Sequence, residues 1–209
     1  PVPKTNLTAS GFWMASTGEG NKESVYGVAT WGSIGHAVDV NLALAKSSLD
    51  KGEVYSSGNS YLALDENNNI VEKKKVNDVT NMRSYGWVAS TGINVAKNVR
   101  FLADYSRTNA DFQNNSLALR LNYRNTDINN PGTYQVYTRY IKYGQNGWLA
   151  GDDEWNSIWN ATKGWIIGFK YVPAKNVEWE TLYSPQVRGW SQDCQYDRKL
   201  VRTQIDFHF

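Results

Sequence analysis

Few residues of this 209-residue chain combine a type and a spacing that suit catalysis or metal binding. His36 lies in the short segment SIGH and His208 is the penultimate residue, and neither has the ligand spacing of a zinc site. Cys194 is a lone thiol in the polar segment GWSQDCQYD, which rules out an internal disulfide and a multi-cysteine metal site. We therefore expect no metal centre, no cofactor and no enzymatic activity.

One acidic cluster, GDDE at residues 151–154, could bind Ca²⁺ weakly. It lacks the alternating ligand spacing and the distal glutamate of a calcium loop. A solvated acidic loop is therefore the better interpretation of this segment.

The remaining candidates are charged side chains at every second position of apolar stretches. In VRTQIDFHF, residues 201–209, Val201 and Ile205 alternate with Arg202 and Asp206. The segments VEWETLY, SLALRLNYR and WIIGFKY show the same period of two, which is the side-chain period of a β-strand. The charged residues assigned to the polar faces in this way are Arg100, Asp104, Arg120, Arg124, Arg139, Lys170, Glu178, Glu180, Arg202 and Asp206.

The alternating stretches predict an all-β chain. Short connections, such as SIGH and VPAKN, alternate with longer polar ones, which is typical of an antiparallel up-and-down order. An even number of strands would place both termini at the end with the short turns. The segment 48–81 holds a candidate hairpin of its own, YLALDENNNIVEKK. The expected strands cover about 5–16, 22–33, 37–47, 82–95, 98–109, 115–124, 133–143, 163–172, 176–187 and 198–209.

One hairpin sequence occurs twice in the chain. GWVASTGINVAKNVRFLADYS, residues 86–106, returns as GWIIGFKYVPAKNVEWETLYS, residues 164–184, without a gap. Both copies have Ala-Lys-Asn at the middle, where Asn98 and Asn176 suit the left-handed conformation of a tight turn. The repeat predicts a generic hairpin unit that is reused around a closed sheet.

Composition restricts the class of protein. Only 20% of the residues are charged and the net charge is +2, which argues against a nucleic-acid binder. The chain has nine tryptophans and thirteen tyrosines, whose amphipathic rings suit a boundary between an apolar environment and water. No run approaches the roughly 18 apolar residues that a spanning helix needs.

The two faces of the strands admit opposite arrangements. A soluble barrel turns its apolar face inward, whereas a membrane barrel turns it to lipid, with aromatic girdles, short turns on one side and longer loops on the other. The strand lengths match a tilted bilayer span, and Trp and Tyr lie near both ends of the apolar faces. We predict one domain, residues 1–209: a transmembrane antiparallel up-and-down β-barrel of about ten strands, with twelve as the alternative count, and with periplasmic termini. A soluble lipocalin-like or lectin-like β protein is the alternative.

The ending RKLVRTQIDFHF, with its terminal Phe209, resembles the C-terminal assembly signal of bacterial outer-membrane barrels. That resemblance implies a bacterial outer-membrane location and recognition by the barrel-assembly machinery. Residues 163–209 also resemble the barrel of S-layer-homology porins, the peptidoglycan-tethering outer-membrane proteins of diderm Firmicutes. Those porins have larger barrels, a peptidoglycan-binding domain and a coiled-coil stalk. The two extra regions are not found in these 209 residues, so tethering is not carried over.

Omptin-type outer-membrane proteases resemble this architecture in having ten strands. They need acidic residues and a histidine at the extracellular rim. His36 and His208 are both expected at the opposite, periplasmic end, so neither such a protease nor a Ser-His lipase is expected.

The predicted function is that of a porin, in which small hydrophilic solutes or ions diffuse passively through a charged lumen. Arg-rich strands would face the glutamates of residues 176–187 across the lumen, and charged walls of this kind select ions in pores. Two features could narrow the passage. The charges could pair across the lumen as a plug. The interior of a barrel of about eight strands is already filled by side chains, so a barrel of ten has little free space. The loop 144–162, with Asp152, Asp153 and Glu154, could fold inward as a constriction.

The alternative function is a non-conducting barrel that anchors or adheres and whose long extracellular loops bind a partner. The expected partners in either case are membrane lipids, including lipopolysaccharide, and the assembly machinery. A homotrimer is compatible with the aromatic surface, and no nucleic acid is expected.

Overall fold

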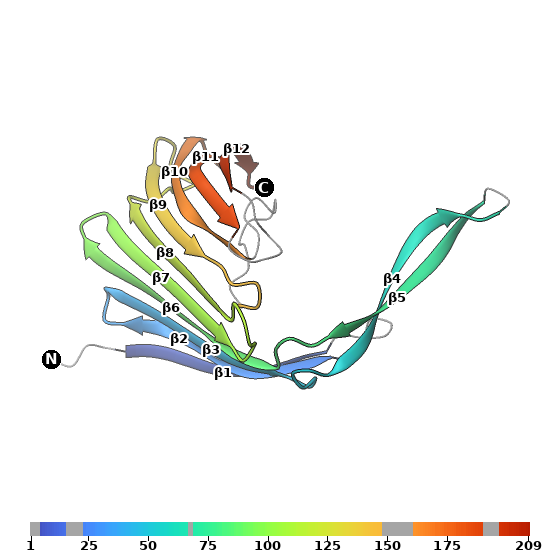
Figure 1. Cartoon of the computed structure of the whole chain (residues 1–209). Helices are drawn as coiled ribbons and strands as arrows, with labels where there is room; N and C mark the ends of the chain where they lie inside the picture. The colour runs from blue at the N-terminus through green and yellow to red at the C-terminus, as the bar shows by residue number, and fades with distance from the viewer. Residues whose placement is uncertain (1–4, 16–22, 67–68, 148–160, 190–196) are drawn as a thin grey trace.

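The computed structural model describes residues 5–15, 23–66, 69–147, 161–189 and 197–209, and all of its regular elements are β-strands. Ten strands form one antiparallel sheet in the order β1-β2-β3-β6-β7-β8-β9-β10-β11-β12, and β4 and β5 pair separately (Figure 1). The bounds are β1 Thr5–Ala15, β2 Ser24–Ile34, β3 Val38–Ser47, β4 Val54–Leu64, β5 Ile70–Thr80, β6 Tyr85–Ala96, β7 Val99–Thr108, β8 Asn115–Tyr123, β9 Tyr134–Lys142, β10 Thr162–Ala174, β11 Val177–Gly189 and β12 Asp197–Phe207.

The predicted up-and-down all-β architecture is confirmed. Each strand of the large sheet is hydrogen-bonded to its neighbours in chain order, apart from β3 and β6, which pair across the inserted hairpin β4–β5. The hairpin expected within residues 48–81 is present as this pair. Both described chain ends lie beside short turns: Thr5 stands opposite Ile34, and the His208 N–H donates to the Asn176 carbonyl at 2.9 Å.

The repeated hairpin forms as expected. The β6–β7 and β10–β11 turns place Asn98 and Asn176 at φ 63° and 62°, in the left-handed region that asparagine tolerates better than most residues. The shared Ala-Lys-Asn sequence therefore has a conformational reason.

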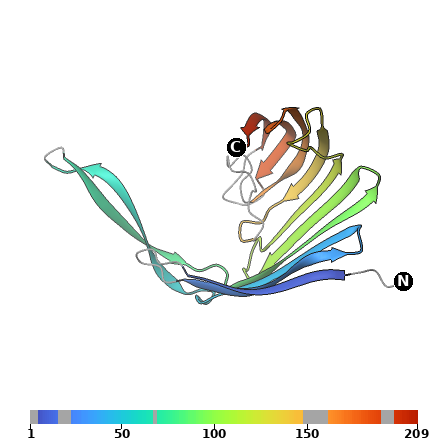
Figure 2. The ribbon, with the colours of Figure 1, turned by 180° about the vertical axis from the view of Figure 1, so that it is seen from behind.

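The large sheet is strongly curved but open. Its margins are β1 and β12, and no pairing joins these two strands among the described residues. Figures 1 and 2 show them at separate edges of a trough. The expected closure of the sheet on itself is therefore not present in the described part of the chain.

Curvature gives the sheet two unlike faces. Alternate positions of β7 to β12 carry buried or half-buried polar side chains, such as Ser106, Gln135 and Glu180, and we call this side the inner face. The opposite, outer face exposes large apolar side chains: Ile167 is 52% and Val201 69% accessible. A small core of Ala118, Tyr137, Ile141, Tyr143, Ile166 and Leu182 lies on the inner side of β8 to β11 and the end of β9.

Candidate functional site

The inner face of β8 to β12 carries a connected network of charged side chains, with Glu180 at its centre. The Tyr137 hydroxyl donates a 2.8 Å hydrogen bond to Glu180 Oε1, and Arg202 lies 3.3 Å from Oε2. Lys170 Nζ is 3.9 Å from Oε1. Only 9% of the Glu180 side chain is accessible, so one nearly buried carboxylate is shared by two cations and a phenol.

Glu178 forms the second acidic position of the network, two residues before Glu180 on the same face. Lys170 donates to its Oε1 at 2.7 Å, and Thr126 donates to its Oε2 at 2.6 Å. Thr126 comes from the β8–β9 connection, so the network joins a turn to β10 and β11. A carboxylate that accepts such charge-assisted bonds is held in one orientation.

The basic side of the network lies on β8 and β9. The Arg120 guanidinium stacks 4.1 Å from the Tyr137 ring centre and donates to Asn122 and Gln135 at 2.7 and 3.1 Å. Arg139 stands directly opposite Arg120 and donates to the Tyr143 hydroxyl. Two arginines facing each other on neighbouring strands create a local positive potential.

Tyr137 links the basic and acidic sides because it lies flat across the neighbouring strand. Its ring covers Gly168 so closely that a Cβ built on this glycine would lie only 2.0 Å from the Cζ atom of Tyr137. The absence of a side chain at Gly168 is therefore what lets the hydroxyl of Tyr137, on β9, reach Glu180 on β11, two strands away. On β6, a Cβ built at Gly92 would also meet a side chain of the neighbouring strand, that of Arg100 on β7.

Several ion pairs between described residues of the inner face run along the wall. Lys170, Glu178, Glu180 and Arg202 belong to the adjacent strands β10, β11 and β12. On the other half of the sheet Arg100 pairs with Asp39, and β6 alone separates their strands. This lateral pairing differs from a plug, in which charges of opposite walls meet across the passage.

The structure places most of the predicted site residues on this face. Arg100, Asp104, Arg120, Arg139, Lys170, Glu178, Glu180, Arg202 and Asp206 all occupy inner-face register positions. Asp206 stands opposite Glu178 and accepts a 2.9 Å bond from Gln204. Asp152, Asp153 and Glu154 lie outside the described residues.

Arg124 requires a correction. It follows the last residue of β8, at φ 60°, and its guanidinium lies 4.6 Å from the ring centre of Tyr134 and 5.7 Å from that of Tyr123. Both tyrosines are outer-face residues. The left-handed backbone at Arg124 ends the alternation of side chains between the two faces. Extending the period of two beyond Tyr123 therefore assigns Arg124 to the wrong face.

Sequence reasoning missed several members of the network. Tyr137 was not assigned to the polar face, although it lies two residues from both Gln135 and Arg139. Asp39 belongs to VDVNLALAK, whose alternation would have placed it with Asn41. Thr126 lies in a turn, where a period of two carries no information.

The positions of the two histidines and the search for metal-binding clusters bear on catalysis and metal binding. His36, in the β2–β3 turn, and His208 both lie at the short-turn end, as expected. Among the described residues, no three His, Cys, Asp or Glu side chains cluster in a way that could hold a metal ion. No helix in the described segments has the length and apolarity to cross a membrane.

Comparison with known proteins gives one structural resemblance to report. A "CymD monoaromatic hydrocarbon channel" aligns over 97% of this chain with a TM-score of 0.43 and 12% identity. The chain spans 61% of the length of that channel. No family model matches the sequence, and no curated protein matches it.

Proposed function

We propose that the large sheet is part of the wall of a transmembrane β-barrel in a bacterial outer membrane, and that its inner face lines an aqueous passage for small hydrophilic solutes or ions. The observation that carries the proposal is the inversion of the two faces. Charged residues occupy the concave side, where a soluble barrel keeps its apolar core, and large apolar residues are exposed on the convex side.

The apolar extent of the outer face and the length of its strands both suit contact with lipid. Its exposed apolar side chains run from β2 to β12, and soluble monomers rarely expose apolar patches of more than a few hundred Å². Strands of 9 to 13 residues match the span of a tilted membrane strand. The exposed outer-face residues include Tyr26, Val28, Leu42, Leu44, Leu121, Val136, Trp165, Ile167, Phe169, Trp179, Tyr183, Val201, Ile205 and Phe207.

Aromatic side chains lie near both ends of the outer face, as in membrane barrels. Trp87 packs against Tyr105 and Tyr140 against Trp165 toward the long-loop end, with ring centres 5.2 and 5.1 Å apart. At the short-turn end Phe169, Tyr171 and Trp179 form a second group. We place the short turns and both termini in the periplasm, with β12 as the segment read by the assembly machinery.

The two open edges must be hydrogen-bonded in a membrane, because hydrocarbon offers no partner to backbone N–H and C=O groups. We propose that further strands stand between β12 and β1. Direct pairing of β1 with β12 would give ten strands, and a barrel of about eight is already filled by its side chains. A wider ring leaves room for the lateral charge network and an open passage.

Transport through such a passage involves no bond breaking. Solutes would be sorted by size and by the electrostatics of the wall. Because Arg120 and Arg139 face one another at mid-strand, we expect a preference for anions. Lys170, Glu178, Glu180 and Arg202 form ion pairs with one another, so their charges largely cancel within the network.

The experiment is single-channel recording of the purified protein in a planar bilayer. We expect discrete, stable conductance steps and a reversal potential in a salt gradient that indicates anion preference. Replacing Arg120→Gln together with Arg139→Gln should move the reversal potential toward cation preference. The matched control, Lys97→Gln with Lys175→Gln, removes the same charge from the two equivalent short turns and should leave the selectivity nearly unchanged. Inserted protein that never conducts would contradict the proposal.

A second candidate is a non-conducting barrel whose loops bind a partner. It is favoured by the hairpin β4–β5, two strands of 11 residues each that project away from the large sheet (Figure 1). An isolated two-stranded hairpin is marginally stable in water. A silent bilayer that contains correctly inserted protein would support this candidate.

A further inference from the structure

The hairpin β4–β5 is a sheet of only two strands, so each strand has one edge without a strand partner among the described residues. Both views show the hairpin extending away from the large sheet (Figures 1 and 2). A two-stranded hairpin is marginally stable in water, and three or more strands are needed for independent stability. Addition of a further strand at one of the two free edges would supply the missing stability.

Backbone hydrogen bonds at the two ends of the hairpin show which residues face the free edge of β4. At the tip the Asp65 N–H donates to the Asn69 carbonyl at 2.9 Å, and at the base the Asn81 N–H donates to the Glu53 carbonyl at 2.8 Å. Hydrogen-bonded pairs recur at every second residue of an antiparallel ladder, and the register between these two pairs is unbroken. The odd-numbered residues of β4 therefore bond to β5. The residues whose N–H and C=O groups point to the free edge are Val54, Ser56, Gly58, Ser60, Leu62 and Leu64.

The two free edges differ in charge. The sequence of β4, VYSSGNSYLAL, contains no charged residue and no proline. Natural proteins protect exposed strand edges with charged side chains, lysine above all, or with proline. β5 has such protection and β4 does not, so β4 is the edge that is open to pairing. The charged residues of β5 are Glu72, Lys73, Lys74, Lys75 and Asp78.

We propose that the free edge of β4 pairs antiparallel with β4 of a second copy of this chain, on the long-loop side and outside the membrane. The product is a four-stranded sheet in the order β5-β4-β4-β5. It has the number of strands that independent stability requires, and it leaves a lysine-bearing β5 at each margin. The inference goes beyond the proposed passage and does not require conduction.

The second copy is the occupant because β4 is complementary to itself. Antiparallel pairing centred on Asn59 sets Gly58 opposite Ser60 of the second copy and runs the full length of both strands. Each outward-facing residue then meets another outward-facing residue, so hydrogen bonds form along the whole edge. Such an interface is isologous, as in most homodimers.

The same pairing of β5 with itself is disfavoured by charge. Centred on Lys75, it would set this lysine opposite its own copy and Glu72 opposite Asp78. Like charges directly opposite each other destabilise a sheet. Self-pairing therefore selects β4 over β5.

Two exposed apolar residues of the hairpin also gain cover from this pairing. Val54 is 60% and Ile70 72% accessible, at opposite ends of the hairpin. Ile70 stands opposite Leu64, which lies an even number of residues from Val54 and so on the same face. In the proposed pair, Val54 falls in one row with Leu64 and Ile70 of the second copy.

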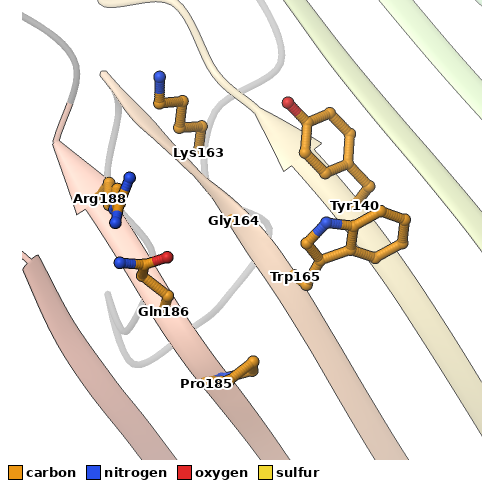
Figure 3. A pocket seen from close by; sticks show the side chains of 7 residues that line it. All are labelled: Tyr140, Lys163, Gly164, Trp165, Pro185, Gln186 and Arg188. Atoms are coloured by element: carbon orange, nitrogen blue, oxygen red, sulfur yellow. The ribbon is translucent and has the colours of Figure 1, made fainter.

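A pocket at the long-loop end of β9 to β11 offers a different kind of surface (Figure 3). It encloses about 560 Å³, and Figure 3 shows side chains such as Tyr140, Trp165 and Arg188 around it. Each of these three strands is hydrogen-bonded on both sides. The pocket therefore presents no row of free backbone groups to an added strand.

The first test is disulfide cross-linking of the full chain in a Cys194→Ser background, in neutral detergent under mild oxidation. Asn59→Cys should give a covalent dimer, because residues at the centre of the pairing have Cα atoms about 4.5 Å apart, which a disulfide can span. The matched control is Lys75→Cys, directly opposite Asn59 on β5. Its two copies would lie about 14 Å apart, three strand spacings, and should stay unlinked.

The second test measures the dimer by native mass spectrometry. Ser60→Pro removes one outward N–H from each copy and should weaken the dimer by about 30-fold, since each of the two lost hydrogen bonds contributes a factor of about five. Lys74→Pro makes the same change directly opposite, at the free edge of β5. It should dimerise as the native chain does.

Three results would overturn the assignment. A native chain that is monomeric at all concentrations would exclude the pairing. Cross-linking of Lys75→Cys instead of Asn59→Cys would identify β5 as the paired edge. A dimer that Ser60→Pro leaves intact would place the contact elsewhere, for example at the open edges of β1 and β12. Single-channel conductance of the same variants reports on the passage alone, so the two proposals fail separately.

Discussion

Replacement of Glu180 by glutamine is expected to lower the free energy of unfolding by about 3 kcal/mol, because it removes a nearly buried carboxylate that two cations and a phenol share. Arg202 loses its 3.3 Å partner and Tyr137 loses a charged acceptor. Lys170 retains Glu178, which keeps the loss near the lower end of the range for broken buried pairs. Urea unfolding of the protein in lipid vesicles, followed by tryptophan fluorescence, measures the change.

The matched control is Asp104→Asn, which removes a carboxylate from the same inner face. Asp104 is half-exposed on β7, away from the Glu180 network, and its loss should change the unfolding free energy by less than about 0.5 kcal/mol. If the two variants are destabilised equally, the network contributes no specific stability and its charges act only as solvated groups.

Gly168→Ala is expected to cost about 2 kcal/mol, because the new methyl group would occupy the space of the Tyr137 ring. Displacement of the ring also breaks its bond to Glu180 and its stacking against Arg120. One added methyl group on β10 therefore weakens contacts between residues of four strands, β8 to β11. The same unfolding assay in lipid vesicles reports the loss.

Gly11→Ala provides the comparison for that glycine effect. Gly11 also lies within a strand, but the nearest atom to a Cβ there, the Gly27 carbonyl oxygen, is 3.8 Å away. We expect no loss of stability for this variant. Equal destabilisation of the two variants would show that strand glycines matter for backbone reasons alone and that the Tyr137–Gly168 contact is incidental.

The architecture could be predicted because its determinants are local. A period of two, turn asparagines and alternating connection lengths identify all ten strands of the sheet, and a repeated Ala-Lys-Asn identifies two equivalent turns. Even the inserted hairpin β4–β5 is visible as YLALDENNNIVEKK. These features depend on each residue's immediate neighbours, which the sequence states directly.

The site was only partly predictable because its partners come from separate strands. Alternation places Glu180 on the polar face, but it does not show that Tyr137 crosses Gly168 to reach it. Alternation also fails where the backbone leaves the strand conformation, as at Arg124. Whether the charges pair along the wall or across it depends on curvature, and curvature is a property of the whole sheet.

The open edges were missed for the same reason. The repeated hairpin suggested a generic unit in a closed sheet, but nothing in a strand's own residues states how sharply the sheet bends. The residues of β1 and β12 do not indicate whether these strands pair with each other, and the absence of pairing between their described residues is visible only in the assembled sheet.

The central claim is that the inner face meets water and the outer face meets lipid, and cysteine scanning along β3 tests it most directly. In a Cys194→Ser background, single cysteines would replace Val40, Asn41, Leu42, Ala43 and Leu44 in turn, with the protein inserted in lipid vesicles. We predict that a membrane-impermeant, water-soluble maleimide labels positions 41 and 43 and leaves 40, 42 and 44 unmodified. Labelling of all five positions, or of the apolar positions alone, would contradict the account.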